Sequence, residues 1–149
     1  MPIGKAVLVS LNEYIYSAGG FRDGKYLDSF SRFSPVQAEW VDLPPMPKAK
    51  RSCSACALGQ TIYIMGGCHL EKTLKNLNDL DTFNVTTFQW SSLTPMNVKR
   101  SLFKAFCIDG TIYAVGRQSV EKYDMEQDKW TNVKILGPST PSIEWAVHC

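Results

Sequence analysis

The sequence predicts an all-β fold built from repeated four-stranded units, and three observations support this. An Ile-Tyr pair stands four and three residues before a glycine at three places, and these glycines, Gly19, Gly66 and Gly116, are separated by 47 and 50 residues. In each copy an aromatic residue also precedes a tryptophan by seven residues. No segment shows the sustained 3.6-residue apolar period of an amphipathic helix. Such self-similarity indicates a repeat architecture.

The middle copy shows how each unit divides into strands. Four segments of β-forming residues follow one another between turn signals: Ser52 to Leu58, Thr61 to Met65, Leu80 to Phe83, and a last one starting near Gln89-Trp90. Gly59-Gln60 favours a tight turn after the first, and Pro95 ends the pairing of the last. Between the second and third, a polar loop is expected from Cys68 to Asn78.

Residues that recur in every unit are expected to serve the architecture rather than one site. The tryptophans and the second-strand tyrosines are expected to pack between units, and the glycines to end the second strand where φ is positive or the backbone approaches closely. These residues are Trp40, Trp90, Trp130, Tyr16, Tyr63, Tyr113, Gly19, Gly20, Gly66, Gly67 and Gly116.

Units of about 50 residues with four strands, a glycine pair and a tryptophan resemble the kelch repeat, one blade of a β-propeller. The resemblance is to the kelch-like proteins and runs from about Ile3 to Trp130. It departs from the family pattern at Arg117, which replaces the second glycine of the third unit, and at Phe33 and Phe83, where tyrosine is usual.

The resemblance implies one partial kelch domain over residues 1–149, an incomplete ring of about three four-stranded antiparallel blades. The blades are expected at about 3–45, 50–95 and 99–135, with 142–149 as the first strand of a truncated fourth blade. Propellers close with about four to eight blades. We interpret the chain as blades cut from a longer ring; the alternative is a half-ring that self-associates with a second copy to complete the propeller.

Composition narrows the partners. Sixteen Lys and Arg against fourteen Asp and Glu give a net charge of +2, without the concentrated basic face that nucleic acid or an anionic membrane requires. No apolar run is long enough for a membrane span, and no secretory signal pattern is visible. Five cysteines, an odd number, then favour reduced thiols and a cytoplasmic protein.

Residues that could carry chemistry are few. Cys53 and Cys56 form a Cys-x-x-Cys, but a zinc site needs a second pair and residues three apart on a strand point to opposite faces. The only histidines are His69, expected in a solvated loop, and His148. Some kelch propellers are copper oxidases or sugar isomerases, yet two histidines do not supply a copper site. We therefore expect no catalytic residue, no metal and no cofactor.

Arg51 and Arg100 are the most informative polar residues, because each opens the innermost strand of its blade, and Lys5 is assigned to the same position in the first blade. In kelch-like proteins this position lies at the mouth of the central pocket, which implies contact with an acidic or polar peptide. The alternative is that the arginines bond to neighbouring strands and hold blades together; both roles can coexist. Loop residues expected to contact a partner are Arg22, Asp23, His69, Glu71, Lys72, Arg117 and Gln118.

The function expected from the resemblance is a non-catalytic protein-interaction module that binds another protein or a peptide segment. If the parent is of the BTB-kelch kind, the resemblance implies the substrate-recognition arm of a cullin-RING ubiquitin ligase, although nothing in the sequence corresponds to BTB or BACK regions. The alternatives are a cytoskeletal, actin-associated scaffold and, from a different class, a kelch-type enzyme.

Overall fold

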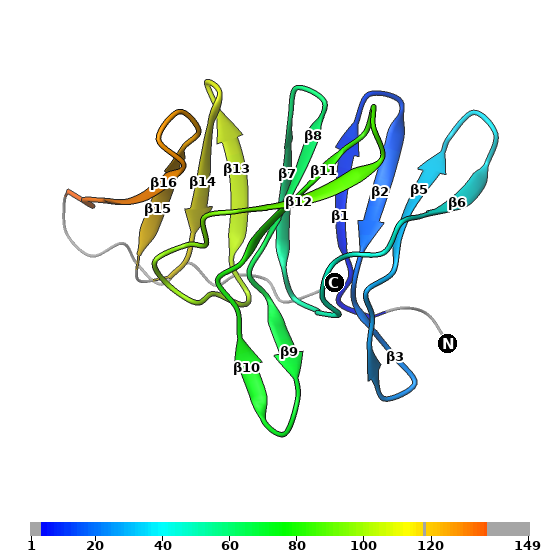
Figure 1. Ribbon diagram of the computed structural model, residues 1–149, viewed down its shortest axis with the longest axis horizontal. Helices are drawn as coiled ribbons and strands as arrows, with labels where there is room; N and C mark the ends of the chain where they lie inside the picture. Colours follow the sequence, from blue (N-terminus) through cyan, green and yellow to red (C-terminus); the bar gives the residue numbers. More distant parts are fainter. Residues whose placement is uncertain (1–3, 118, 137–149) are drawn as a thin grey trace.

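The computed structural model describes residues 4–117 and 119–136, and these form three four-stranded antiparallel sheets set side by side (Figure 1). Blade 1 contains β1 (Val7–Leu11), β2 (Tyr14–Ala18), β5 (Phe30–Ser34) and β6 (Glu39–Leu43). Blade 2 contains β7 (Ser54–Leu58), β8 (Thr61–Met65), β11 (Leu80–Asn84) and β12 (Gln89–Leu93). Blade 3 contains β13 (Lys104–Ile108), β14 (Thr111–Val115), β15 (Val120–Asp124) and β16 (Lys129–Val133).

The predicted all-β class is confirmed in the described residues, where every element is a strand. Among these residues, therefore, no helix has the length and apolar character needed to cross a membrane. The expected fourth-blade strand at residues 142–149 lies outside the described part of the chain.

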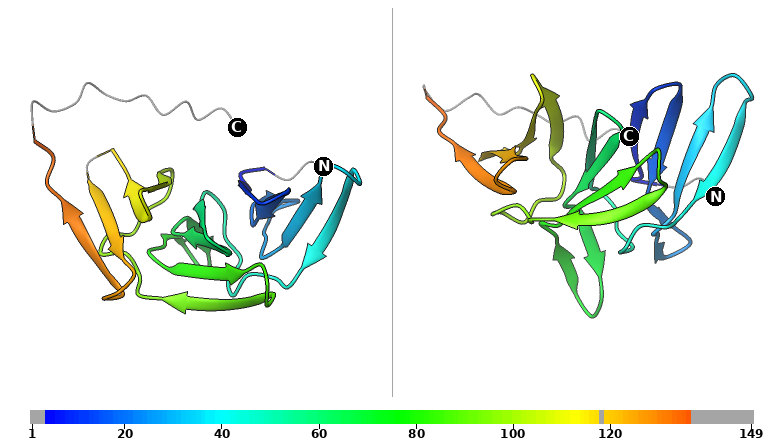
Figure 2. Two further views of the ribbon diagram at one scale, coloured as in Figure 1. Left: turned by 90° about the horizontal axis from the view of Figure 1, so that it is seen from above. Right: turned by 45° about the horizontal axis from the view of Figure 1, so that its top comes forward.

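The blades form an arc whose inner side carries the first strand of each sheet. Seen from above in Figure 2, β1, β7 and β13 line the concave side, while β6, β12 and β16 lie on the outside. The strand β7 contacts both β1 and β13, so the inner strands are direct neighbours. Within each blade the sheet therefore runs radially, in chain order from the inside outward.

Two short hairpins project beyond the lower edge of the sheets in Figure 1. One is formed by β3 (Phe21–Arg22) and β4 (Lys25–Tyr26), the other by β9 (Cys68–Leu70) and β10 (Leu74–Asn76). The polar loop expected from Cys68 to Asn78 is thus wrong in part, because this segment pairs with itself. Its ladder places Leu70 opposite Leu74, a cross-strand apolar pair of the kind that supports a hairpin.

Apolar residues of adjacent blades interdigitate in two clusters, one at each blade interface. Between blades 1 and 2 lie Tyr16, Ala18, Phe30, Met46, Cys53, Ile62, Ile64 and Phe83. Between blades 2 and 3 lie Cys56, Tyr63, Met65, Leu80, Met96, Phe103, Ile112, Ala114, Tyr123 and Trp130. Side chains that alternate along a strand supply both clusters from blade 2, as the period of two requires.

The seven-residue aromatic spacing seen in the sequence is a cross-strand pair. Phe33 lies opposite Trp40, Phe83 opposite Trp90 and Tyr123 opposite Trp130, with ring centroids 5.3, 5.1 and 5.2 Å apart.

The indole N–H groups of the second and third pairs then reach the preceding blade. Trp90 donates to the Pro44 carbonyl at 2.8 Å and Trp130 to the Thr94 carbonyl at 2.9 Å. Trp40, on the face of blade 1 turned away from blade 2, is 55% exposed, so the expectation that it packs between blades is not met within the described residues.

Gly66 ends β8 where another blade approaches. Its φ is +59°, and a Cβ at this position would lie 2.5 Å from the Arg100 carbonyl oxygen and 2.8 Å from the Phe103 ring. A side chain would therefore clash with the connection between blades 2 and 3, which explains why a glycine recurs here.

Candidate functional site

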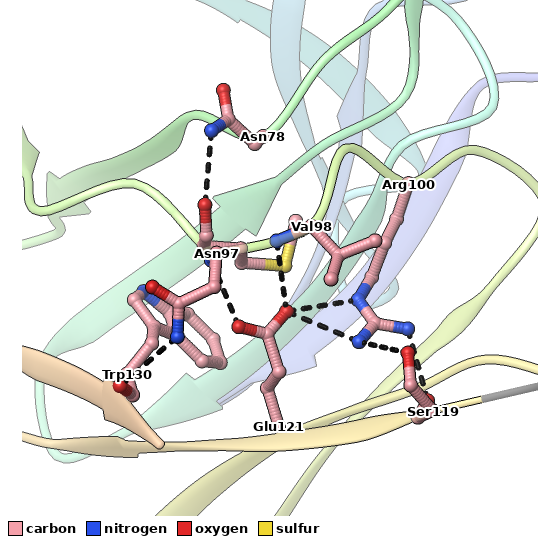
Figure 3. Close-up of polar contacts among 8 residues, drawn as sticks. Asn78, Asn97, Val98, Arg100, Ser119, Glu121 and Trp130 are labelled. Atoms are coloured by element: carbon pink, nitrogen blue, oxygen red, sulfur yellow. Dashed lines mark hydrogen bonds and ion pairs between the residues drawn. The ribbon is translucent and has the colours of Figure 1, made fainter. Parts of the chain in front are cut away.

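A buried ion pair holds the connection between blades 2 and 3. Arg100 is 6% exposed and donates through Nε and Nη2 to Glu121 Oε2 at 3.2 and 3.1 Å (Figure 3). It also donates to the carbonyl and the hydroxyl of Ser119, at 2.9 and 2.8 Å. Glu121 is fully buried and accepts in addition from the backbone N–H groups of Asn97 and Val98. All of these Arg100 hydrogen bonds therefore go to residues of blade 3.

This environment corrects the interpretation of Arg100 as a partner-binding residue at the pocket mouth. Its fork is already occupied by a carboxylate and by Ser119, and the charge is enclosed by protein. The alternative weighed from the sequence, in which the arginine joins strands and blades, is what the structure contains. Gly116 belongs to the same arrangement, because a Cβ there would lie 2.6 Å from Arg100 Nη1.

Lys50 occupies the matching place at the start of blade 2. Its Nζ is buried and lies 2.8 Å from Asp79 Oδ2 and 3.2 Å from Asp81 Oδ2. Burial of Lys50 disfavours the ammonium form, but the charges of Asp79 and Asp81 outweigh it and raise the pKa of Lys50. Burial also raises the pKa of Asp79, although the Lys50 ammonium opposes this.

Sequence reasoning missed Lys50 because it aligned the blades one residue out of register. The Gly20 N–H donates to the Lys50 carbonyl just as the Gly67 N–H donates to the Arg100 carbonyl, so these two cations are equivalent. The repeated Pro-Met pairs, Pro45-Met46 and Pro95-Met96, lie 50 positions apart. The same offset aligns Lys50 with Arg100, so the sequence contained the information needed for the correct alignment.

The same register separates the three residues that the sequence grouped together. Arg51 makes a bridge with Cys68, and Gly4 makes the matching bridge with Phe21. Lys5 therefore corresponds to Ser52, and both have positive φ, at 59° and 56°. The assignment of Lys5 to the arginine position is wrong, and Arg51 is not the counterpart of Arg100.

Arg51 lies instead against two aromatic rings of the first hairpin. Its Cζ is 5.0 Å from the ring centroid of Phe21 and 5.0 Å from that of Tyr26. These rings are 5.5 Å apart and meet edge to face. Arg51 is half-buried, and its Nε is buried without a hydrogen-bond partner among the described residues. The guanidinium is thus positioned by cation–π contacts rather than by a carboxylate.

His69 extends this group onto the second hairpin. Its Nδ1 lies 2.6 Å from the Ala49 carbonyl oxygen, and its ring lies edge-on to Tyr26 with centroids 6.3 Å apart. The expectation of a freely solvated loop histidine is wrong, because the side chain is half-buried and fixed at one nitrogen. We name Phe21, Tyr26, Arg51 and His69 the rim cluster.

The other predicted loop residues surround the rim cluster or lie apart from it. Arg22 and Asp23 are exposed at the tip of the β3–β4 hairpin, and Glu71 and Lys72 at the tip of β9–β10. Glu71 accepts from Lys75 at 2.9 Å, and this hydrogen bond lowers the pKa of Glu71. Arg117 is exposed on blade 3, far along the arc, while Gln118 lies outside the described residues.

The cysteines are packed within the blade interfaces. Cys53 is 8% and Cys56 is 7% exposed, and they belong to different apolar clusters, as expected for residues that point to opposite faces. Burial raises the pKa of Cys53 to about 11 and that of Cys56 to about 12. In the described part of the chain, no three His, Cys, Asp or Glu side chains are grouped so as to hold a metal ion.

Radial four-stranded sheets joined in an arc define a protein of the β-propeller class. The chain belongs to the kelch-repeat family, since it matches the KLHDC2/KLHL20/DRC7 Kelch-repeats domain over residues 3–149. The resemblance inferred from the glycine and tryptophan spacing is thereby confirmed.

Individual relatives agree with this assignment. Kelch-like ECH-associated protein 1A of Danio rerio is 36% identical over 107 residues, which cover 70% of this chain and 17% of that protein. Kelch-like protein 23 of Homo sapiens is 24% identical over 143 residues, covering 95% of this chain and 25% of the relative. The chain thus spans a quarter or less of the length of these relatives.

Among solved structures, that of YjhT superposes with a TM-score of 0.75 at 13% identity. The match covers 89% of this chain and 51% of YjhT. At this identity the likeness supports the fold alone.

Proposed function

We propose that the chain is a non-catalytic protein-interaction segment of a kelch propeller, and that it contributes to substrate recognition for a cullin-RING ubiquitin ligase. Membership of the kelch-repeat family and similarity to several kelch-like proteins support the interaction role. The ligase role rests on the likeness to kelch-like proteins in particular. We place this activity in the cytoplasm, because an odd number of cysteines favours reduced thiols over a set of disulfides.

One observation carries the proposal: two hairpins project from the same edge of a rigid arc (Figure 1). The sheets bury their faces against each other, whereas the tips of β3–β4 and β9–β10 are exposed. Loops held on a packed scaffold are where recognition residues concentrate. This edge therefore offers a partner an ordered surface at little cost in conformational entropy.

Capture of partners by charge-reversed chains tests the interaction role. Lys72→Glu with Lys75→Glu changes two exposed residues of the β9–β10 hairpin and also removes the Lys75–Glu71 ion pair, and Lys122→Glu with Lys129→Glu makes the same charge change on the exposed side of blade 3. Captured proteins are identified by mass spectrometry after mild crosslinking in cells. We expect the hairpin variant to lose partners that the blade 3 variant keeps.

The ligase role needs a second readout on the same partners. Blocking cullin activation should raise the abundance of a partner captured through the hairpins, because its ubiquitination would stop. Partners whose abundance does not change would contradict the ligase role while leaving the interaction role intact. Enrichment of actin in the captured set, lost in the hairpin variant, would favour the cytoskeletal scaffold instead.

A further inference from the structure

Two cysteines on the inner strands of blades 2 and 3 are aligned with each other. The Ala105 backbone N–H donates to the Ser54 hydroxyl oxygen at 2.7 Å, and this bond fixes how β13 lies against β7. Both strands lead into hairpin turns on the same edge of the sheets (Figure 1). The residues two positions further along each strand are therefore neighbours as well. These residues are Cys56 and Cys107.

Both cysteine side chains point into the interface between the two blades. Successive side chains of a strand alternate between its faces, so Cys107 lies on the same face of β13 as Ala105, which packs against the apolar cluster between blades 2 and 3. Cys56 belongs to that cluster. After burial, the neighbouring Cys107 thiol is the other cause of the raised pKa of Cys56. The two thiols therefore face each other across the interface.

The separation of the two strands is one that a disulfide can span. The hydrogen bond between Ala105 and Ser54 keeps the Cα atoms of these residues within about 7 Å of each other, given ordinary bond lengths. Disulfides join Cα atoms that are about 4.4–6.8 Å apart. Cys56 and Cys107 are both free thiols. A bond between them thus requires only a small adjustment of two neighbouring strands.

Exposure distinguishes the two thiols. Cys107 is half-buried, whereas Cys56 is only 7% exposed. Burial raises the pKa of Cys56 to about 12, so this thiol stays protonated at neutral pH, and the thiolate is the form that attacks an oxidant. A dissolved oxidant therefore reacts first with Cys107. Cys53 and Cys68 are both buried and offer no such access.

We propose that Cys107 is an oxidation site for hydroperoxides and that Cys56 is its resolving thiol, so that oxidation links blade 2 to blade 3 by a disulfide. The Cys107 thiolate attacks one oxygen of hydrogen peroxide, the O–O bond breaks and hydroxide leaves, which converts Cys107 to a sulfenic acid. The Cys56 sulfur then displaces the sulfenic hydroxyl, which leaves with the thiol proton as water. In total, two thiols are oxidised to one disulfide and one peroxide is reduced to two waters.

The fixed position of Cys56 compensates for its low thiolate fraction. Because the two thiols are held face to face, the second step is intramolecular and has a high effective concentration. The disulfide should stabilise the chain, since it joins residues that are far apart in the sequence. The proposal is independent of the proposed interaction function, because it concerns the interface between blades and requires no partner.

Peptide mapping after peroxide treatment tests the proposal directly. The purified full chain is reduced, treated with hydrogen peroxide, alkylated under denaturing conditions and digested without reductant for mass spectrometry. We expect a disulfide between Cys56 and Cys107 as the main product, with Cys53 and Cys68 recovered as alkylated thiols. The oxidised chain should melt about 5 °C or more above the reduced chain. Reduced glutathione should reverse this shift.

Matched variants separate the roles of the two thiols. Cys56→Ala removes the resolving thiol, so dimedone, which traps sulfenic acids, should label Cys107 about tenfold more than in the parent chain. Cys53→Ala makes the same change to a buried cysteine between blades 1 and 2 and should leave the disulfide yield unchanged. Backbone amide spectra of the reduced variants show whether the fold is kept. Cys56→Ser provides the same test if the alanine variant loses the fold.

Four results would overturn the inference. The first is equal dimedone labelling of Cys107 in the parent chain and in Cys56→Ala. The second is a disulfide that joins Cys107 mainly to Cys149 or to a second chain. The third is oxidation of Cys53 or Cys68 as fast as that of Cys107. The fourth is a melting temperature that does not rise on oxidation.

Discussion

At the scale of single residues, the buried pair of Arg100 and Glu121 is the interaction on which the connection between blades 2 and 3 most depends. Replacing Glu121 with Ala leaves the guanidinium buried without its carboxylate and also frees the N–H groups of Asn97 and Val98. We expect a loss of about 3–5 kcal/mol in the free energy of unfolding, measured by urea denaturation.

The neighbouring Lys122→Ala variant is the matched control, because Lys122 is exposed on the same strand. Its effect should stay within about 0.5 kcal/mol. A loss below about 1 kcal/mol for Glu121→Ala would show that water or rearranged side chains readily replace the carboxylate.

The buried thiol of Cys56 should make the folded chain less stable as the pH becomes alkaline. Burial raises the pKa of Cys56 from 9.0 to about 12, so the folded chain keeps a proton that the unfolded chain releases above pH 9. The contribution to stability is fully present below pH 9 and is lost as the pH rises toward 12. Each pH unit in this window costs about 1.4 kcal/mol for this thiol.

The Cys56→Ala variant removes this titration. Between pH 9 and pH 11, its free energy of unfolding should fall less steeply than that of the parent, by about 1.4 kcal/mol per pH unit. Guanidinium denaturation at several pH values measures both slopes. Parallel slopes would mean that the Cys56 thiol ionises as easily in the folded chain as in the unfolded one.

Among single residues, sequence reasoning recognised repeated positions better than unique ones. The Phe33, Phe83 and Tyr123 partners of the tryptophans follow from spacing, because a fixed interval in a β-hairpin produces a cross-strand pair. The roles of Lys50 and Arg51 did not follow, because neighbouring residues on a connection differ completely in burial. A shift of one residue in the alignment therefore assigns Arg51, which belongs to the rim cluster, to the position that the buried cation Lys50 occupies.

At the scale of elements, a comparison of two glycine substitutions tests why a glycine recurs at the end of each second strand. The account predicts that the close approach of the neighbouring blade is the reason. Gly66→Ala places a Cβ 2.5 Å from the Arg100 carbonyl at a φ of +59°, so we expect a loss of about 3 kcal/mol or more. Gly59→Ala has almost the same φ, +60°, but nothing within 4 Å, and should lose only about 1–2 kcal/mol.

Urea denaturation of the two glycine variants therefore isolates the contact, because backbone strain is nearly equal in both. Equal losses in the free energy of unfolding would mean that the positive φ alone explains the glycine. The connection between blades 2 and 3 would then move aside for the added Cβ without loss of stability.

The β9–β10 hairpin was predicted as a loop because its sequence is polar and short strands give a weak alternation signal. The two strands of this hairpin are stabilised by contacts with the rest of the fold. Cys68 forms a β-bridge with Arg51, and the Asn76 side chain accepts a hydrogen bond from the Ser101 hydroxyl at 3.0 Å. The four strands of blade 2, in contrast, were predicted to within a few residues, since their β-branched and aromatic runs are bounded by glycine and proline.

At the scale of the whole molecule, the arc has an apolar face at each end. On blade 1 the face turned away from blade 2 carries Leu8, Ile15 and Trp40, which are 64%, 37% and 55% exposed. On blade 3 the corresponding outward face carries Phe106 and Ile108, at 46% and 57%. These positions repeat those that bury themselves at the two internal interfaces, so each face is shaped to receive a blade.

We expect the purified chain to cover these faces by self-association, giving a light-scattering mass above 16.7 kDa. Trp40→Lys should lower that mass, whereas Val36→Lys, at an 88% exposed turn position, should not. A monomer that binds little of an apolar-surface dye would contradict this expectation.

The most direct test of partner recognition is a hydrogen-exchange footprint of the chain with a captured partner. Binding through the rim predicts slowed exchange in the β3–β4 hairpin, the connection from 46 to 52 and the β9–β10 hairpin. The turns at Gly59 and Gly110, on the opposite edge of the sheets in Figure 1, should exchange as in the free chain. Slowed exchange confined to that opposite edge, or to the outer strands β6, β12 and β16, would contradict recognition by the rim.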